Sequence, residues 1–198
     1  MSSFSVPQAT LALTALVSTI GTYLALSPPN PSPETASTVG DSISRLHLTS
    51  KHMTKVAMAP IGILALHTSS LAYFHPDIPP FLLRYGAENG LNQSLITWSP
   101  ATAVPLALIL CAGVPLRLRS YATLGKNFTF ALAEPDRLTT SGIYRYVQHP
   151  SYTGLVTLIL CNVSLVGRID GALSCWFAPT LFPYFRIAEW AGGAYVAR

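Results

Sequence analysis

Long stretches without any charged residue restrict the fold of this chain more than any other feature. The first 33 positions contain no Asp, Glu, Lys or Arg, and four more such stretches follow, at residues 56–76, 89–116, 146–167 and 171–185. An α-helix rises about 1.5 Å per residue, so it needs about 20 largely apolar residues to cross the hydrocarbon core of a membrane. Four of the five stretches reach that length, which predicts helices that span a membrane.

The amino-acid composition argues against a water-soluble domain. The 198 residues are 50% hydrophobic, and only 10% are Asp, Glu, Lys or Arg, whereas a soluble domain carries about 25%. A long disordered tail would also lower the charge content, but the apolar residues here are Leu, Ile, Val, Ala and aromatics, which need burial. We therefore expect an all-α integral membrane protein.

We expect about five transmembrane helices, near residues 6–26, 56–74, 96–116, 151–167 and 171–185, the last two forming a helical hairpin. Gly171, directly after Asp170, suits the tight turn of that hairpin. The fifth segment has only 15 residues, and it can span the membrane if it is tilted or if its neighbours Ile169 and Ile187 are included. Because no Lys or Arg precedes Arg45, we interpret the first segment as a membrane helix rather than a cleaved signal peptide.

The basic residues predict an orientation. If the five segments alternate across the membrane, one side holds ten of the twelve Lys and Arg residues, and the other holds only Arg84 and Arg168. The positive-inside rule then places the N-terminus in the lumen and places the C-terminus and residues 27–55 and 117–150 in the cytosol. The basic residues are scattered rather than gathered in a patch, which argues against binding of nucleic acid.

The cysteines and isolated histidines predict structural roles. Cys111, Cys161 and Cys175 all fall in apolar segments without a C-x-x-C pair, so we expect buried thiols, no disulfide framework and no metal site. His67 is alone on an apolar segment and is interpreted as a hydrogen-bonded interior histidine rather than a ligand. The sequon that starts at Asn92 is on the predicted lumenal side, where glycosylation could reach it.

The densest run of polar and aromatic residues lies at 117–152, on the predicted cytosolic side. Polar and ionisable residues are costly at a membrane boundary, so this run is the place to expect a functional site. The chain has no Gly-rich phosphate loop, no G-x-S-x-G elbow and no H-E-x-x-H helix, which are the marks of common soluble enzymes. A nucleotide-like cofactor would therefore need a different architecture.

Several short motifs follow one another from this run onward. They are Leu124-Gly125, Phe128-Thr129-Phe130, Arg137-Leu138-x-Thr140-Ser141-Gly142-Ile143-Tyr144, His149-Pro150-Ser151-Tyr152-x-Gly154 and Arg186-Ile187-x-Glu189. This order resembles the isoprenylcysteine carboxyl methyltransferase family, integral membrane enzymes that are related to the phospholipid methyltransferases and use S-adenosylmethionine. The resemblance covers about residues 117–189. T-S-G-x-Y followed by H-P-S-Y is its specific part.

The resemblance implies an S-adenosylmethionine-dependent carboxyl O-methyltransferase. Its substrate would be the carboxylate of a C-terminal prenylcysteine or a similar lipophilic isoprenoid acid, its other partner would be membrane lipid, and its location would be the endoplasmic reticulum. A carboxylate nucleophile is already ionised, so the reaction needs no general base. Alignment of the reactants and exclusion of water would supply the rate gain. We expect a single membrane domain over residues 1–198, with three helices in 1–116 and the methyltransferase-like region in 117–198.

The resemblance also implies which residues form a cytosolic cofactor-binding segment. The pocket would be lined by Asp136, Arg137, Leu138, Thr139, Tyr144, His149, Pro150, Ser151, Tyr152 and Glu189. Tyrosine hydroxyls and a histidine N–H can form hydrogen bonds to the cofactor. The alternative for these residues is an interfacial aromatic belt followed by a helix that starts at Pro150.

Arg186 and His149 are the catalytic residues that the resemblance implies. The guanidinium of Arg186 would bind the substrate carboxylate through two parallel hydrogen bonds. The alternative for Arg186 is a positive-inside anchor at the cytosolic end of the last segment. We interpret Arg117, Arg119 and Arg145 as anchors or contacts to lipid headgroups.

Three departures from the family pattern leave a second function open. The family has an arginine where this chain has Gln148 and a second glutamate where it has Trp190, and its C-terminal stretch is longer. A degenerate member of the family could bind a lipid or isoprenoid, or run a different reaction on it, without methyl transfer. The intact motif from Tyr144 to Tyr152 favours the methyltransferase.

Overall fold

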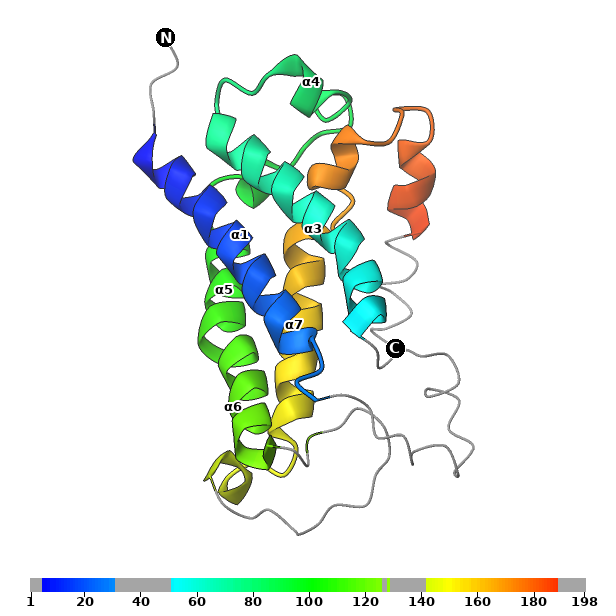
Figure 1. Cartoon of the computed structure of the whole chain (residues 1–198). Helices are drawn as coiled ribbons and strands as arrows, with labels where there is room; N and C mark the ends of the chain where they lie inside the picture. The colour runs from blue at the N-terminus through cyan, green and yellow to red at the C-terminus, as the bar shows by residue number, and fades with distance from the viewer. Residues whose placement is uncertain (1–4, 31–50, 126–127, 129–141, 189–198) are drawn as a thin grey trace. The chain divides into compact units, whose positions relative to one another are not determined.

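The computed structural model describes residues 5–30, 51–125, 128 and 142–188, and its regular elements in these ranges are all helical (Figure 1). The α-helices are α1 (Val6–Leu26), α3 (Lys51–Phe74), α4 (Pro80–Leu83), α5 (Pro100–Leu108), α6 (Val114–Leu124) and α7 (Pro150–Val166). Shorter helical turns are η2 (Gln93–Leu95), η3 (Ile109–Gly113), η5 (Gly142–Arg145) and η6 (Ala172–Cys175). Residues 182–188 are also helical. Over the described ranges, the all-α prediction is confirmed.

Three of the helices are long and apolar enough to cross a membrane. They span Val6–Leu26 with 21 residues, His52–Phe74 with 23 and Gln93–Leu124 with 32, and they contain the first three segments predicted from the sequence. The apolar helix α7 is shorter, with 17 residues. The chain is therefore an integral membrane protein by its helices, and a total of five spans stays a prediction.

The fifth predicted segment, residues 171–185, is not one continuous helix. It contains η6, then a turn, and then the start of the helical residues 182–188. Proline is the physical reason, because Pro179 has no N–H to donate and its ring disfavours helical backbone at Ala178. The predicted hairpin of two continuous helices is thus wrong in its second arm. The predicted turn is present, since the Gly171 N–H donates to the Arg168 carbonyl over 3.1 Å.

Hydroxyl side chains on α1 bond to the backbone of their own helix. Thr14 donates to the Thr10 carbonyl at 2.7 Å, and Thr22 donates to the Ser18 carbonyl at 2.9 Å. A hydrocarbon environment offers no water to such groups, so they must find acceptors within the protein. These local bonds let an apolar helix carry several Ser and Thr residues at little cost.

A wide turn joins α5 to α6. The π-helical turn η3 makes it, and the Val114 N–H donates to the Ile109 carbonyl five residues earlier. Pro115 follows directly, and because it lacks an N–H it cannot supply the usual bond to the carbonyl of Cys111. The helix continues through this irregular turn as α6.

The chain forms two compact units, each assembled from separate parts of the sequence. Unit 1 consists of Met1–Val17, Ile61–Leu106 and Asn162–Arg198, and unit 2 consists of Ser18–Pro60 and Ala107–Cys161. The boundaries fall inside α1, α3, α5 and α7, so the units are not sequential domains. The predicted single domain with a division after residue 116 stays a prediction.

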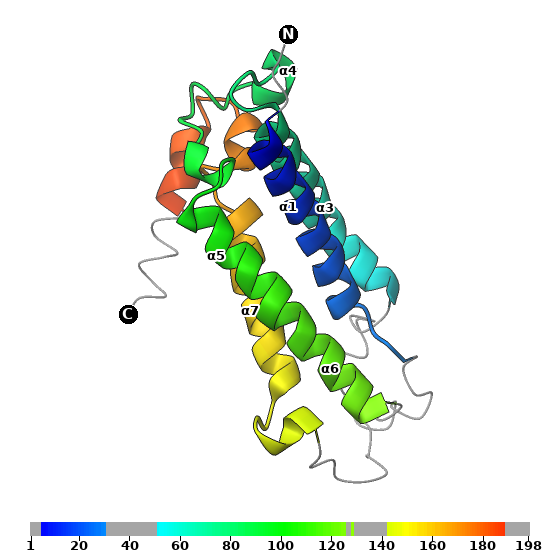
Figure 2. The same cartoon turned by 90° about the vertical axis from the view of Figure 1, so that its left-hand side faces the viewer.

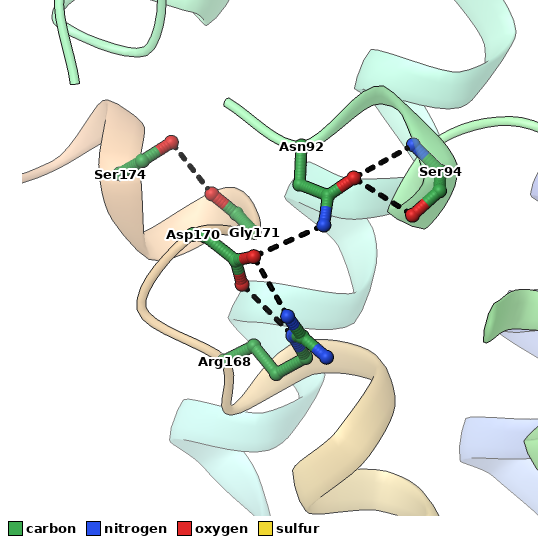
Figure 3. Close-up of polar contacts among 6 residues, drawn as sticks. All are labelled: Asn92, Ser94, Arg168, Asp170, Gly171 and Ser174. Carbon is green, nitrogen blue, oxygen red and sulfur yellow. Dashed lines mark hydrogen bonds and ion pairs between the residues drawn. The ribbon is translucent and has the colours of Figure 1, made fainter. Parts of the chain in front are cut away.

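Unit 1 is held together by polar side chains of the segments that join its helices (Figure 3). The Asn92 side-chain oxygen accepts hydrogen bonds from the Ser94 N–H at 3.0 Å and from the Ser94 hydroxyl at 2.7 Å. The Asn92 amide donates to Asp170 at 3.0 Å. Arg168 donates to both carboxylate oxygens of Asp170, at 2.8 and 2.7 Å. Both ends of the Asn92 amide are therefore used within the fold, which disfavours glycosylation there.

His67 has the structural role that the sequence predicts. Its Nδ1 accepts a hydrogen bond of 2.6 Å from the Trp176 indole N–H. Its Nε2 therefore carries the ring proton and donates to the Leu82 carbonyl, 3.0 Å away. The neutral ring thus joins α3 to α4 in unit 1, where α4 lies near the C-terminal end of α3 (Figure 1).

Candidate functional site

The H-P-S-Y motif begins α7. Pro150 is the first residue of the helix, a position where a missing N–H costs nothing, and it is fully buried. His149 and Tyr152 are exposed, with Tyr152 at 68%. Their rings meet edge to face, with centroids 6.0 Å apart. The start of α7 therefore presents two polar aromatic rings together, while its proline packs inward.

Tyr144 lies on η5 and is half-buried. Its side chain forms a hydrogen bond with Ser120 of α6. Burial raises the pKa of the Tyr144 phenol, and this effect is opposed by the hydrogen bond with Ser120 and by the positive charge of Arg117. The phenol is thus protonated at neutral pH, and it can serve as a hydrogen-bond donor.

Gly142 explains why the T-S-G-x-Y motif needs glycine. Its φ is +62°, in the left-handed region that favours glycine. A Cβ at this position would also lie 3.2 Å from the Thr123 side chain on α6. The glycine therefore allows η5 to turn close to α6, and that approach brings Tyr144 to Ser120.

Gly154 explains the last position of the second motif. A Cβ there would lie 2.9 Å from Cγ of Arg117 and 3.0 Å from the carbonyl oxygen of Gly113. A Cβ on Gly113 would in turn lie 2.8 Å from the Leu158 side chain. The two glycines let α7 lie directly beside η3 and α6 (Figures 1 and 2), as small residues do where membrane helices pack closely.

Arg117 is buried, with 3% of its surface exposed, so its interpretation as a surface anchor is wrong. Its Nη1 donates to the Ser151 hydroxyl at 2.7 Å, and its Nε donates to the Ala25 carbonyl at 3.0 Å. The Tyr121 hydroxyl donates to the same carbonyl. These bonds satisfy a cation that burial would otherwise penalise heavily.

The helical spacing in the sequence groups Arg117 with residues that are also buried, although it does not show what packs against them. Ser120, Tyr121 and Leu124 lie three, four and seven positions after it, which places all four residues on one helical face. Ser120 and Tyr121 are buried as well. Arg119 and Arg145 are exposed, so their roles as anchors stay predictions.

The structure does not place the remaining predicted site residues beside those of unit 2. Arg186 belongs to unit 1, on the helical residues 182–188, and its side chain is exposed. Its role in binding a carboxylate stays a prediction. Five of the predicted pocket residues lie outside the part of the chain that the structure describes, namely Asp136, Arg137, Leu138, Thr139 and Glu189. Unit 2 brings together Tyr144, His149, Ser151 and Tyr152 around the adjoining ends of α6 and α7.

Comparisons with known proteins point to the same part of the chain. Residues 106–189 match the model of the Isoprenylcysteine carboxyl methyltransferase (ICMT) family. A protein-S-isoprenylcysteine O-methyltransferase of Schizosaccharomyces pombe is 34% identical over 80 residues, which are 38% of this chain and 33% of that protein. The protein of the same name from Mus musculus is 33% identical over 96 residues, which are 46% of this chain and 32% of the relative. No solved structure matches.

These alignments cover about a third of each curated relative. The matched segment contains α6, η5 and the start of α7, which carry the described residues of the candidate site in unit 2. Local geometry and sequence similarity therefore single out one region. Over residues 106–189, this chain is similar to the isoprenylcysteine carboxyl methyltransferase family.

Proposed function

We propose that this chain is an S-adenosylmethionine-dependent carboxyl O-methyltransferase that acts on a prenylcysteine carboxylate or a similar lipophilic isoprenoid acid. The observation that carries the proposal is the match of residues 106–189 to the family. Two relatives of this chain are each named a protein-S-isoprenylcysteine O-methyltransferase. The membrane-spanning helices support a substrate with a large apolar part.

The side chains at the start of α7 fit the proposed cofactor chemically. S-adenosylmethionine would supply a methyl group carried on a sulfonium, and it offers an adenine ring, a ribose and a charged amino-acid end to bind. The exposed rings of His149 and Tyr152 can stack on a flat base and form hydrogen bonds. The phenol of Tyr144 adds a donor. We propose that these three side chains hold the cofactor.

An apolar stripe on α7 suits the isoprenoid part of the substrate. Val156, Ile159 and Leu160 are exposed, at 53%, 49% and 64%, and they follow Tyr152 at helical spacing on one face. A prenyl chain lying along this face would leave its carboxylate near the start of α7. Membrane lipid would cover the same face when no substrate is bound.

For methyl transfer to a carboxylate, the protein mainly has to bind the two reactants and orient them. The substrate carboxylate needs no proton removed before it attacks a methyl group. Two opposite charges neutralise one another in the transition state, so a site that excludes water favours the reaction. We propose that Arg186 binds the carboxylate through its two-pronged guanidinium, and that the site faces the cytosol from the membrane of the endoplasmic reticulum.

Binding of radiolabelled S-adenosylmethionine by the detergent-solubilised chain tests the proposal. We expect saturable binding, and we expect His149→Ala to weaken it about tenfold, because the variant loses a ring contact and a hydrogen bond. Tyr146→Ala is the matched control, since Tyr146 is an exposed aromatic side chain near the motif but outside the proposed pocket. The control should bind as the wild type does.

Methyl transfer to N-acetyl-S-farnesylcysteine completes the test. The wild-type chain should methylate this compound, and the analogue without the farnesyl group should be a poor substrate. Absence of saturable cofactor binding, or binding that His149→Ala leaves unchanged, would contradict the proposal. Binding of the farnesyl compound to the chain without methyl transfer would instead support a protein that only binds isoprenoids.

A further inference from the structure

Arg117 joins three segments of unit 2. It is carried by α6, it donates through Nε to the Ala25 carbonyl near the end of α1 at 3.0 Å, and it donates through Nη1 to the Ser151 hydroxyl at the start of α7 at 2.7 Å. A second, longer contact of 3.5 Å runs from Nη1 to the Ser151 carbonyl. One planar cation therefore fixes the distance between the end of one helix and the beginning of another.

Aromatic side chains enclose this guanidinium. Its central carbon lies 5.1 Å from the centre of the Tyr121 ring and 6.0 Å from that of Phe128. The two rings pack against each other with centres 4.3 Å apart. Such cation–π contacts compensate for lost hydration, and Arg makes them better than Lys does because its guanidinium is flat and less strongly hydrated. The site is built for an arginine.

The part of the chain that receives these bonds reaches beyond the family match. Ala25 lies in α1, whereas the match begins at residue 106. Asn30, which follows α1, donates to the carbonyls of Gly125 and Phe128 at 2.8 and 2.9 Å. The end of α1 and the residues after it are thus tied to the matched segment by Arg117, Tyr121 and Asn30. This frame lies next to the proposed cofactor residues, because Ser151 lies in the first turn of α7, between His149 and Tyr152.

We propose that Arg117 is a positioning residue for methyl transfer. It touches neither substrate nor cofactor. It holds Ser151 and the first turn of α7, and thereby sets the orientation in which His149 and Tyr152 meet the cofactor. The inference rests on the proposed function, and it adds that α1 supplies part of the support for the cofactor site.

Kinetics of matched variants test this role. Arg117→Gln removes the charge and both strong bonds, and Ser151→Ala removes the acceptor of one of them. We expect each variant to raise the KM for S-adenosylmethionine about tenfold, the usual scale for a lost hydrogen bond to a charged group. Arg117→Lys keeps the charge and one donor, so it should restore part of the loss. The double variant Arg117→Gln/Ser151→Ala should be no worse than Arg117→Gln alone, because Arg117 acts through Ser151.

Thr102→Val is the structural control. It removes a buried hydroxyl of unit 1 that donates to the carbonyls of Thr97 and Ser99, so it should lower the unfolding temperature while the KM for the cofactor stays at the wild-type value. The proposal is overturned if folded Arg117→Gln has wild-type kinetics, if the double variant shows additive losses, or if Thr102→Val raises the KM equally. If Arg117→Gln does not fold, then an unchanged KM in Ser151→Ala overturns it.

The outcome for the wild-type chain separates this inference from the function on which it rests. A wild type that neither binds the cofactor nor transfers a methyl group overturns both. A wild type that binds the cofactor without turnover contradicts methyl transfer alone, and dissociation constants of the same variants then take the place of KM. If the wild type transfers the methyl group and the Arg117 and Ser151 variants have the same KM for the cofactor as the wild type, only the role of Arg117 is overturned.

Discussion

Two regions of the molecule bury polar side chains, and they use them differently. In unit 1, the buried Asn89 amide donates to the carbonyls of Ser174 and Phe177 at 2.7 and 2.9 Å, and the half-buried side chains of Asn92 and Asp170 bond to each other. In unit 2, a similarly buried group, Arg117, supports the start of α7, where His149 and Tyr152 are exposed. The hydrogen bonds in unit 1 link groups of the protein to one another. Those of Arg117 in unit 2 support exposed side chains that a ligand can reach.

The difference shows why a dense polar run is a weak sign of a site by itself. Asn92, Arg168 and Asp170 would look functional in a sequence, yet their hydrogen bonds are used by the fold (Figure 3). A side chain can bind a ligand only if its polar atoms and its surface are accessible. Polar rings that stay exposed beside a rigid, buried cation meet this condition better than a closed network does.

The largest expected effect concerns the proposed substrate arginine. Arg186→Gln removes two charge-assisted hydrogen bonds, so kcat/KM for N-acetyl-S-farnesylcysteine should fall about a hundredfold, while binding of the cofactor stays the same. Methyl transfer by the purified variant measures this. Arg168→Gln is the matched control, because Arg168 pairs with Asp170 in the closed network. Equal losses in both variants would show that Arg186 has no special role.

A smaller effect, on stability, is expected from the helix contact that supports the site. Gly154→Ala places a methyl group 3.0 Å from the Gly113 carbonyl oxygen and 3.2 Å from the Arg117 backbone nitrogen. The helices must move apart, which should cost about 1–3 kcal/mol of unfolding free energy. Gly62→Ala on α3 meets no atom within 4 Å and should stabilise slightly through helix propensity. Thermal unfolding in detergent compares them, and equal shifts would contradict the close contact.

The closed network of unit 1 should respond to pH. The hydrogen bond from Arg168, with a further one from Asn92, lowers the pKa of Asp170. The carboxylate therefore adds stability above its unfolded pKa of about 3.9, and this stability is lost as the pH falls through the lower folded pKa. Because the group is partly exposed to solvent, the contribution should stay below about 1 kcal/mol.

Unfolding temperatures of the wild type and Asp170→Asn should thus differ slightly at pH 7 and converge toward pH 3. Asp77→Asn serves as the control, because Asp77 is an exposed carboxylate of the same unit. A difference that grows on acidification would mean that the Asp170 carboxylate is not stabilised in the folded state.

The smallest expected effect is none at all. Asn92 begins a sequon, but its amide bonds to Ser94 and Asp170, so we expect no glycan on it. Electrophoretic mobility after expression in eukaryotic membranes should be the same with and without glycosidase treatment. A shift that Asn92→Gln abolishes would show that Asn92 is glycosylated before these hydrogen bonds form.

Sequence reasoning succeeded where the local pattern decides the structure. The predicted boundaries 6–26 coincide with α1, and the predicted turn at Gly171 is present. It failed for residues 171–185, where apolar composition hid the effect of Pro179, and for Arg117, which was counted as a surface charge. The sequence does not say what packs against a helical face, so it could not show that Arg117 is enclosed by Tyr121, Phe128 and Ser151.

The sequence by itself determined that this chain is helical and membrane-embedded, because uncharged apolar stretches of this length can satisfy their backbone hydrogen bonds in lipid only as helices. The sequence also contains the short motifs in the order that resembles the family. Only the tertiary structure decided which polar residues support others and which remain accessible. Burial depends on contacts between distant segments, such as that from Arg117 to Ala25, and no local pattern contains them.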